Sequence, residues 1–552
     1  MRGKYHSYKF FVILFVIGFL FSCTKPEQPN PCIVDGVDTC TTSNTLKAII
    51  SIGEENQVIH SFGASDCWAI KYIGKYWPES KKNQIADLLF SKAVDSQGKP
   101  LGIGLSMWRM NIGAGSFEQG SASKITSPWR REECFQNERG EFDWGKQEGN
   151  LWFAKAAKNR GVENLLAFTL SPPVHMTKNR LAFGSSGSEL GKLNLSDQKY
   201  DEYAEFVANV LNNLHTKGIP VNFFSPINEP QWDWVAGPSG EAGQEGTSAT
   251  NAEAFSLVSA LNNSFLRNNV STKISFGEVG SLNLLSAPAS WLSDRSDVFN
   301  YFWNKSSSSY LGNLSSVEKV ISGHSYFSQP DLSMLVNSRS QLKSRMASIN
   351  NEIGFWQSEY CILLNEDGTQ GNGRDLGIAS ALYIARVIHH DLVLANASSW
   401  QWWLGVSPSD YKDGLVYVTD PNGQMGENPS AIYDGQVLES KMLWALGNFS
   451  RFIRPGMVRV NAIIEGMEDP LMSASNLMIS AFKNSNDREL VLVLVNISSK
   501  SKKLEIHGLP GLSSTYKRYT TSVSKKLDFS TGATNSAIEI EPQSVSTIVF
   551  NY

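Results

Sequence analysis

The sequence predicts an α/β protein: a (β/α)8 TIM barrel with an attached antiparallel β-sandwich side domain built from both chain ends. Three observations support this prediction. The chain has 552 residues, which is too long for one small domain. Eight short β-type runs alternate with helical stretches between about residues 59 and 404. Past residue 455 the runs are short, β-branched and separated by Gly, Pro, Ser and Asn, which is typical of a sandwich.

The barrel strands are runs of apolar and β-branched residues bounded by turn residues. They are predicted at 59–64, 105–112, 165–171, 221–227, 273–276, 320–326, 354–359 and 398–404. Helices are clearest at 200–214 and 376–394, where apolar residues recur at three- and four-residue spacing. No Gly-rich dinucleotide turn follows the first strand, so a barrel is favoured over an open doubly wound sheet.

The sandwich is predicted from six runs in the last hundred residues and one early run. The late runs lie at 477–482, 489–495, 503–507, 515–520, 538–540 and 545–550. The early run, 46–52, precedes the first barrel strand and is expected to join the same sheet. The resulting domain bounds are 45–58 for the N-terminal part of the sandwich, 59–454 for the barrel and 455–552 for the rest of the sandwich.

The start of the chain predicts export. Three basic residues precede an apolar run at 10–21, a pattern typical of a secretory signal and too short for a membrane span. Leu-Phe-Ser-Cys at 20–23 resembles the lipobox of bacterial lipoproteins, which implies removal of residues 1–22 and lipidation of Cys23. Residues 23–44 then form a Pro-containing tether. The protein is expected to be anchored to the outer membrane, with the membrane face left open.

Composition excludes several classes of function. The formal charge is −4 without a block of like charge, so a nucleic-acid partner is not expected. No nucleophile elbow, phosphate loop or zinc helix is present, and no metal or organic cofactor is implied. The adjacent residues at 389–391, His-His-Asp, diverge around a helix and are predicted to be structural. Fifteen Trp residues fit a sugar-binding surface.

The cysteines carry little chemistry. Cys67, Cys134 and Cys361 are predicted to be buried thiols, and none of the six cysteines has Cys-x-x-Cys spacing. Cys32 and Cys40 are close enough in sequence to close a small loop, and whether they pair is left open. The sequence carries no signal for an oligomeric state.

Two glutamates carry the predicted chemistry. Glu229 lies in Pro-Ile-Asn-Glu-Pro at the end of the fourth barrel strand, where Pro230 should favour an extended backbone. Glu359 lies in Trp-Gln-Ser-Glu-Tyr at the end of the seventh strand. Barrel strand ends meet at one rim, so the two carboxyl groups are expected to converge there. Two carboxyl groups about 5–5.5 Å apart suffice to hydrolyse a glycosidic bond with retention.

Asn-Glu-Pro ending strand four and Glu ending strand seven resemble clan A glycoside hydrolases, and further segments resemble glycoside hydrolase family 30. These are His-Ser-Phe-Gly-Ala-Ser at 60–65, Trp-Arg-Met-Asn-Ile-Gly at 108–113, Ser-Pro-Pro-Val-His-Met-Thr at 171–177 and Ser-Arg-Phe-Ile-Arg-Pro-Gly at 450–456. The resemblance covers roughly residues 45–552. It implies a retaining double displacement with Glu229 as acid/base and Glu359 as nucleophile.

Four further residues are predicted to support this pair. Arg109, at the end of strand two, is the candidate cation that keeps Glu359 ionised. Asn228 is placed to hydrogen-bond the sugar 2-hydroxyl. Tyr326 resembles the clan's tyrosine that hydrogen-bonds the nucleophile. His324 is expected to be either a structural histidine or a sugar ligand.

Aromatic residues on strand eight are predicted to form the floor of the subsite for the cleaved sugar. Trp400 and Trp402 alternate along the strand and share a face, whereas Trp403 should point outwards into the helices. Asp66 and Trp68 follow strand one and are candidates for binding sugar hydroxyls and a ring face. The alternatives for these two are a capping residue and a core aromatic.

The substrate is predicted from resemblance alone. The segments at 109–116, 129–135 and 142–144 look like the endo-β-1,6-galactanase branch of family 30, which implies cleavage of β-1,6-linked galactan. A β-1,6-glucanase or an exo-acting β-glycosidase remains open within the family. A non-catalytic, lipid-anchored glycan-binding protein is the alternative of another class. The expected partner is a polysaccharide or oligosaccharide.

Overall fold

The structure is a computed structural model that describes residues 33–34, 37–38, 45–363, 369–509 and 511–552. The chain divides into two compact units, Met1–Asn44 and Thr45–Tyr552. In the first unit, β1 (Ile33–Val34) pairs antiparallel with β2 (Val37–Asp38). Cys23, Cys32, Cys40 and the predicted signal segment lie outside the described residues.

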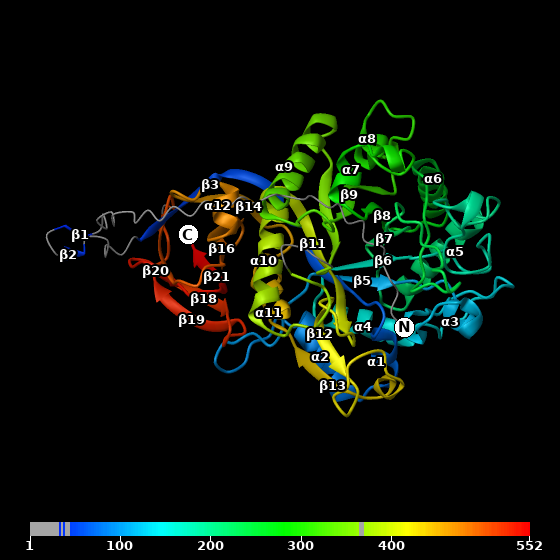
Figure 1. Ribbon diagram of the computed structural model, residues 1–552, viewed down its shortest axis with the longest axis horizontal. Helices are drawn as coiled ribbons and strands as arrows, with labels where there is room; N and C mark the ends of the chain where they lie inside the picture. Colours follow the sequence, from blue (N-terminus) through cyan, green and yellow to red (C-terminus); the bar gives the residue numbers. More distant parts are fainter. Residues whose placement is uncertain (1–32, 35–36, 39–44, 364–368, 510) are drawn as a thin grey trace, which may run out of the picture. The chain divides into compact units, whose positions relative to one another are not determined.

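A closed barrel of parallel strands forms the centre of the second unit (Figure 1). Its strands are β4 (Ser61–Ser65), β5 (Met107–Asn111), β6 (Asn164–Phe168), β7 (Phe223–Ser225), β8 (Lys273–Val279), β9 (Val317–His324), β10 (Gly354–Tyr360) and β11 (Ala397–Ser407). The barrel closes because β11 pairs in parallel with both β10 and β4. The predicted eight-stranded barrel is therefore confirmed.

Helices cover the outside of the barrel and follow most of its strands. They are α1 (Ile70–Tyr76), α2 (Glu79–Phe90), α4 (Glu148–Asn159), α5 (Tyr200–Thr216), α6 (Asn251–Arg267), α7 (Leu282–Ser286), α8 (Val298–Trp303), α9 (Leu332–Ile349), α10 (Ile378–Val393) and α11 (Lys441–Ser450). Two short helices lie elsewhere: α3 (Ser116–Gln119) is in the loop after β5, and α12 (Pro470–Ala474) follows strand β14 (Val458–Ile464). In Figure 1, β5 to β9 lie between α9 and α10 on one side and α5 and α6 on the other. The predicted apolar face of α5 is buried, including Tyr203, Phe206 and Leu214. No helix of the described chain is long and apolar enough to cross a membrane.

The second sheet has nine strands in the described chain and is mostly antiparallel. In spatial order they are β19 (Asp528–Ala533), β18 (Thr515–Thr521), β21 (Ser544–Asn551), β16 (Glu489–Asn496), β15 (Leu477–Asn484), β14 (Val458–Ile464), β3 (Leu46–Val58), β17 (Lys502–His507) and β20 (Ile538–Ile540). The early strand β3 pairs with β14 and β17, so both chain ends build this domain, as predicted. Arg518 on β18 donates to the carbonyl of Glu539 on β20 at 2.9 Å, which shows that the sheet curls over itself.

The two domains share a continuous apolar contact. Along β16, one set of alternating side chains (Leu490, Leu492 and Leu494) fills the core of the second sheet. The other set (Val491, Val493 and Val495) joins the core cluster of the barrel and its helices. A strand buried on both faces has apolar residues at every position, because side chains alternate between faces.

In the second unit the sequence prediction missed four of the described strands. After β11 the sheet continues with β12 (Gly414–Thr419) and β13 (Gln436–Glu439), and the sandwich also contains β14 and β19. β19 reads Asp-Phe-Ser-Thr-Gly-Ala and has no apolar alternation. Such strands are held by pairing with neighbours in the sheet, which composition does not reveal.

Candidate active site

Both predicted catalytic glutamates lie at the carboxyl ends of barrel strands and line one cavity of about 180 Å³. The cavity walls are formed by Asn228, Glu229, Trp232, Trp234, Gln244, Tyr326, Phe327, Glu359, Cys361, Leu363 and Trp403. One carboxylate oxygen of Glu229 lies within 4.8 Å of one of Glu359. An approach this close between one oxygen of each group is in keeping with the carboxyl spacing of about 5–5.5 Å that direct attack on an anomeric carbon requires.

A buried histidine bridges two carboxylates of the site. His324 Nδ1 lies 2.9 Å from Glu229 Oε1, and its Nε2 lies 3.1 Å from Glu278 Oε2. Burial disfavours the charged ring, but Glu359, Glu229 and Glu278 outweigh it and raise the pKa of His324 to about 10. His324 is therefore an imidazolium that donates from both ring nitrogens. Both ring nitrogens face carboxylates, which favours the structural one of the two predicted roles of His324.

Glu278 is the site residue that the sequence prediction missed. It ends β8, is fully buried, and its Oε2 also accepts from Arg109 Nη2 at 3.0 Å. Burial acts against ionisation, but Arg109 and His324 hold the pKa of Glu278 below its usual value. The predicted fifth strand ended at Phe276, two residues short of this carboxylate. A strand end placed correctly would have shown a third acid on the rim.

The predicted partners of Glu359 are found in contact with it. Arg109 Nη1 donates to Glu359 Oε2 at 3.1 Å, and the Tyr326 hydroxyl donates to Oε1 at 3.1 Å. Burial raises the pKa of Glu359, while His324 and Arg109 oppose this effect. Asn228 lines the cavity and is 4 % exposed, and its Oδ1 has no hydrogen-bond partner among the described residues. An unpaired buried acceptor beside the acid is suited to a ligand hydroxyl.

Glu229 has a left-handed backbone conformation, with φ of 45°. The sequence prediction of an extended conformation before Pro230 is therefore wrong. Two contacts hold the residue: its N–H donates to the carbonyl of Glu278 at 2.9 Å, and Trp234 Nε1 donates to its carbonyl at 2.9 Å. Non-glycine residues in this region cost of order 1–3 kcal/mol and persist where surrounding contacts over-determine them.

A buried polar network holds the loop that carries His324 and Tyr326. Ser325, between them, donates to Asp391 of α10 at 3.1 Å. Asp391 also accepts from Arg339 Nε of α9 at 2.8 Å and from Trp400 Nε1 at 2.9 Å. Asp391, Arg339 and Trp400 are fully buried. Asp391 of the predicted structural trio therefore ties two helices and β11 to the loop after β9.

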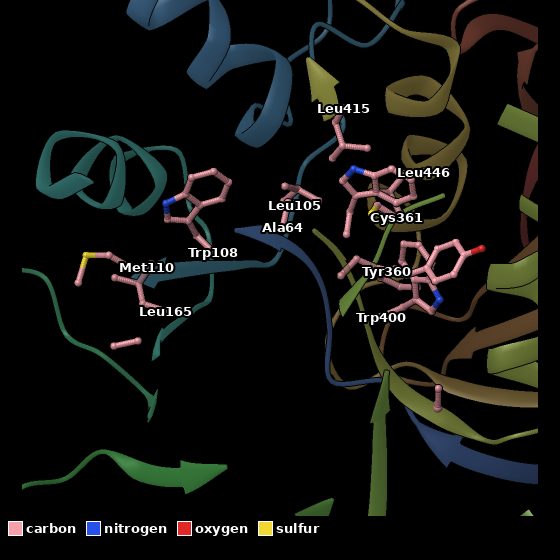
Figure 2. Close-up of a cluster of buried hydrophobic side chains, with 14 of the residues drawn as sticks. Ala64, Leu105, Trp108, Met110, Leu165, Tyr360, Cys361, Trp400, Leu415 and Leu446 are labelled. Atoms are coloured by element: carbon pink, nitrogen blue, oxygen red, sulfur yellow. The ribbon is translucent and has the colours of Figure 1, made fainter. Parts of the chain in front are cut away.

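The predicted floor of the subsite is wrong, because β11 faces the other way. Trp400 and Trp402 point outwards into the core between barrel and helices; Figure 2 shows Trp400 beside Tyr360 and Cys361 in that cluster. Trp403, which was expected to point outwards, lines the cavity. Ser399 hydrogen-bonds Ser61 across the strands at 2.9 Å, and Gln401 donates to Ser399, so odd-numbered residues face the interior.

Asp66 and Trp68 do not line the cavity. Asp66 is fully buried and accepts from the Asn111 N–H and from Asn150 Nδ2, both at 2.9 Å. Its predicted role in binding sugar hydroxyls is therefore wrong, since both carboxyl oxygens join structural elements. Trp68 is 7 % exposed and packs edge-on against Trp403 with ring centroids 5.4 Å apart, so it supports the cavity wall from behind.

The three donor atoms of Glu229, His324 and Glu359 are close enough to surround one metal ion. His324 Nδ1 and Glu229 Oε1 are 2.9 Å apart and already form a hydrogen bond with each other. The geometry instead describes a network of charged hydrogen bonds around two carboxylates.

Residues 45–417 match the family model described as O-glycosyl hydrolase family 30. The match covers both predicted catalytic glutamates and more than half of the chain. The chain belongs to glycoside hydrolase family 30.

Relatives of this family 30 chain include the glucuronoxylanase XynC of Bacillus subtilis (strain 168), which is 29% identical over 175 residues. That match spans 31% of this chain and 34% of the relative, so only about a third of the curated protein is covered. A conserved exported protein from Bacteroides fragilis is 32% identical, with a TM-score of 0.84 over 91% of this chain and 100% of that one. The xylanase C catalytic domain from Talaromyces cellulolyticus shares the fold at 21% identity, with a TM-score of 0.63 over 92% and 100% of the chains.

Proposed function

We propose that this family 30 protein cleaves β-1,6-linked galactan, as found on arabinogalactan side chains, by a retaining double displacement. The carrying observation is the approach of Glu229 and Glu359 within 4.8 Å in one cavity. The choice of galactan rests on the resemblance at 109–116, 129–135 and 142–144 to the galactanase branch.

In the first step a Glu359 carboxylate oxygen attacks the anomeric carbon and forms an ester with the sugar. The bond to the leaving oxygen breaks, and Glu229 transfers its proton to that oxygen. In the second step Glu229 takes a proton from water, and the water oxygen displaces Glu359 from the anomeric carbon. The sugar leaves with its original configuration and both glutamates return to their starting states.

The charges of the site support this division of roles. Arg109 and His324 supply two positive charges, and the carboxylates of Glu278 and Glu359 supply two negative charges. Both cations lie against the proposed nucleophile, with Arg109 Nη1 3.1 Å from Glu359 Oε2 and His324 Nδ1 3.8 Å from Glu359 Oε1. Charges fixed before reaction stabilise a transition state without reorganisation.

A glycan panel tests the proposal. Purified protein is incubated with β-1,6-galactan, β-1,6-glucan and glucuronoxylan, and reducing ends and product lengths are measured. The expected result is galacto-oligosaccharide release that Glu359→Gln abolishes while binding remains. Release from β-1,6-glucan or glucuronoxylan only would show that galactan is not the substrate. Products that are single terminal sugars would indicate exo action. Binding without release from any glycan would favour the non-catalytic alternative.

We also propose that the protein is exported and lipid-anchored at the outer membrane through Cys23. The support is the basic segment, the apolar run and the Leu-Phe-Ser-Cys motif. Labelling with a palmitate analogue should mark the wild-type protein and leave Cys23→Ser unmarked. Equal labelling of both would reject the anchor.

A further inference from the structure

The catalytic cavity is too small to hold a length of glycan chain. Its volume of about 180 Å³ is below the roughly 300–1,000 Å³ of typical ligand sites. It accommodates the reacting part of the substrate, so the other sugars of a polymer must lie on neighbouring parts of the rim.

A second, larger cavity of about 720 Å³ lies at the carboxyl ends of β5 and β6. We call it the β5–β6 cavity. Its walls come from residues 114–119, 134–146 and 174–180, which all belong to loops that follow these two strands. Strands of one barrel end at the same rim, so the loops that line this cavity start from the rim that carries Glu229 and Glu359.

A short buried junction connects the two cavities. Gln244 lines the catalytic cavity, and its neighbour Glu245 accepts hydrogen bonds from Ala114 N at 3.1 Å and from Ser116 Oγ at 2.5 Å. Ala114 also lines the β5–β6 cavity, and its carbonyl accepts from Val174 N at 2.8 Å. The hydrogen bonds of Glu245 and Ala114 therefore join the loops that line the two cavities.

One wall of the β5–β6 cavity is apolar and aromatic. The half-buried Phe142 stacks on Trp144 with ring centroids 4.6 Å apart and lies parallel to Phe206 at 6.2 Å, so its orientation is fixed and its free edge borders the cavity, while Phe135 is buried. Val174 completes this wall. Apolar surfaces of this kind cover the C–H faces of sugar rings.

The rim is rich in hydrogen-bond acceptors and has a negative balance of charge. Four carboxylates line it: Glu118, Glu138, Glu141 and Asp143. The two cationic side chains are each paired with one of them, Lys146 with Glu118 at 3.1 Å and Arg180 with Glu138 at 3.5 Å. Carboxylate acceptors suit sugar hydroxyls, and the charge balance disfavours a uronate or sulfate group.

We propose that the β5–β6 cavity is a distal subsite that binds neutral sugar units of the same glycan chain. This inference rests on the proposed function and deepens it, because it makes the enzyme select long neutral chains. A branch that carries glucuronate is excluded from this cavity by the acidic rim.

The test measures kcat/KM on β-1,6-galacto-oligosaccharides from two to eight units. The ratio of the longest to the shortest substrate should exceed about 10 for wild type, which corresponds to roughly 1.4 kcal/mol of distal binding. Phe142→Ala removes part of the apolar wall and Glu141→Lys reverses one rim charge, and both should bring the ratio close to one. Glu505→Lys, the same change on β17 of the second sheet, is the matched control and should keep the wild-type ratio.

A wild-type ratio near one, or equal ratios in all four proteins, would overturn the distal subsite. Calorimetric titration of oligosaccharides into the Glu359→Gln variant separates a failure of the distal subsite from a failure of the proposed function. Neutral octasaccharide should bind at least about tenfold more tightly than disaccharide, and Phe142→Ala in the same background should lose the difference. If wild type cleaves nothing but this difference persists, the proposed function fails and the neutral-sugar site stands. If cleavage occurs without the difference, only the distal subsite fails.

Discussion

At the scale of single residues, Gly246 leaves the space that the ring of Trp234 needs in order to hold the backbone of Glu229. A Cβ on Gly246 would lie 2.6 Å from the ring of Trp234, and that ring donates to the Glu229 carbonyl. Contacts this short force the ring to move. The strained backbone of Glu229 thus depends on a residue outside the catalytic set.

Gly246→Ala should lower kcat by about 10- to 100-fold, because displacement of Trp234 releases the Glu229 backbone. Gly243→Ala lies in the same loop with nothing within 4 Å of the added Cβ, and it should retain wild-type activity. Steady-state kinetics on the cleaved glycan checks both variants. Equal rates for the two alanines would show that Trp234 does not position Glu229.

The pH profile of kcat/KM reports on the ionisation of Glu359. Attack requires the carboxylate, and burial raises the pKa of Glu359, so activity should be lost on the acid side at a higher pH than for an ordinary glutamate. His324→Gln removes a positive charge that opposes this shift. In this variant the acid side of the pH profile of kcat/KM should therefore move further towards neutral pH. A limb that stays in place or moves to lower pH would contradict this electrostatic role of His324.

Residue identity and spacing predicted much of the cluster around Glu359. Glu229, Glu359, Arg109 and Tyr326 stand at strand ends, and the contacts between them follow from barrel geometry. Glu278 was missed, because the predicted strand stopped at Phe276 and a buried carboxylate in an apolar strand has no neighbour pattern that corrects the strand end. Its function depends on two cations that approach it from β5 and β9.

At the scale of elements, the side to which alternate residues of β11 point decides which of its tryptophans line the cavity. Every position from 399 to 404 of β11 is buried except the half-buried Trp403, so alternation gives no sign of which face is inside. The register with β4 settles it, because Ser399 and Ser61 hydrogen-bond inside the barrel. Alternation of apolar and polar residues cannot show which face of a strand points inside when both faces are covered.

The contact between α9, α10 and the loop after β9 is the second feature at this scale. Asp391→Ala should lower the free energy of unfolding by about 3–5 kcal/mol, because Arg339 is left as an unpaired buried charge. Chemical denaturation measures this loss. Asp201→Ala, an exposed acid on α5, is the control and should change stability by less than about 1 kcal/mol.

Asp391→Asn keeps the shape of the side chain and tests positioning more finely. It should lower kcat with little change in KM, because Ser325 and its neighbours His324 and Tyr326 lose part of their support. It should also move the acid limb of the pH profile, since both neighbours face Glu359. A loss of stability with an unchanged kcat and pH profile would restrict Asp391 to a structural role.

At the scale of the whole molecule, buried acids make stability depend on pH. Burial raises the pKa of Asp66 to about 7, of Glu132 to about 8 and of Glu245 to about 7. The folded state therefore binds more protons than the unfolded state above the ordinary carboxyl range. His60 and His390, whose pKa values burial lowers to about 4, act in the opposite direction only below pH 6.5.

The melting temperature should consequently fall as the pH rises from about 6.5 to 8.5, by calorimetry or fluorescence. Each of these acids contributes up to about 1.4 kcal/mol per pH unit until it ionises in the folded state. Glu132→Gln removes the group with the highest of the three pKa values and should flatten the decline. A melting temperature that rises over this interval would contradict the assignment of protons to the buried acids.

The division into barrel and sandwich was predictable because the two domains differ in their sequence pattern. Alternating strands and helices describe the barrel, and short β-branched runs describe the sandwich. The edge strands were not predictable, because β13 and β19 gain their structure from pairing with β12 and β18. The β5–β6 cavity was equally hidden, since it is formed where three loop segments meet in space.

The stereochemistry of the first-formed product tests the central claim most directly. Fresh hydrolysis of the β-linked glycan that the protein cleaves is followed by proton NMR before the anomers equilibrate. Direct attack by Glu359 across the short gap to Glu229 predicts that the β-anomer appears first. Initial release of the α-anomer would show a single displacement by water and contradict the account.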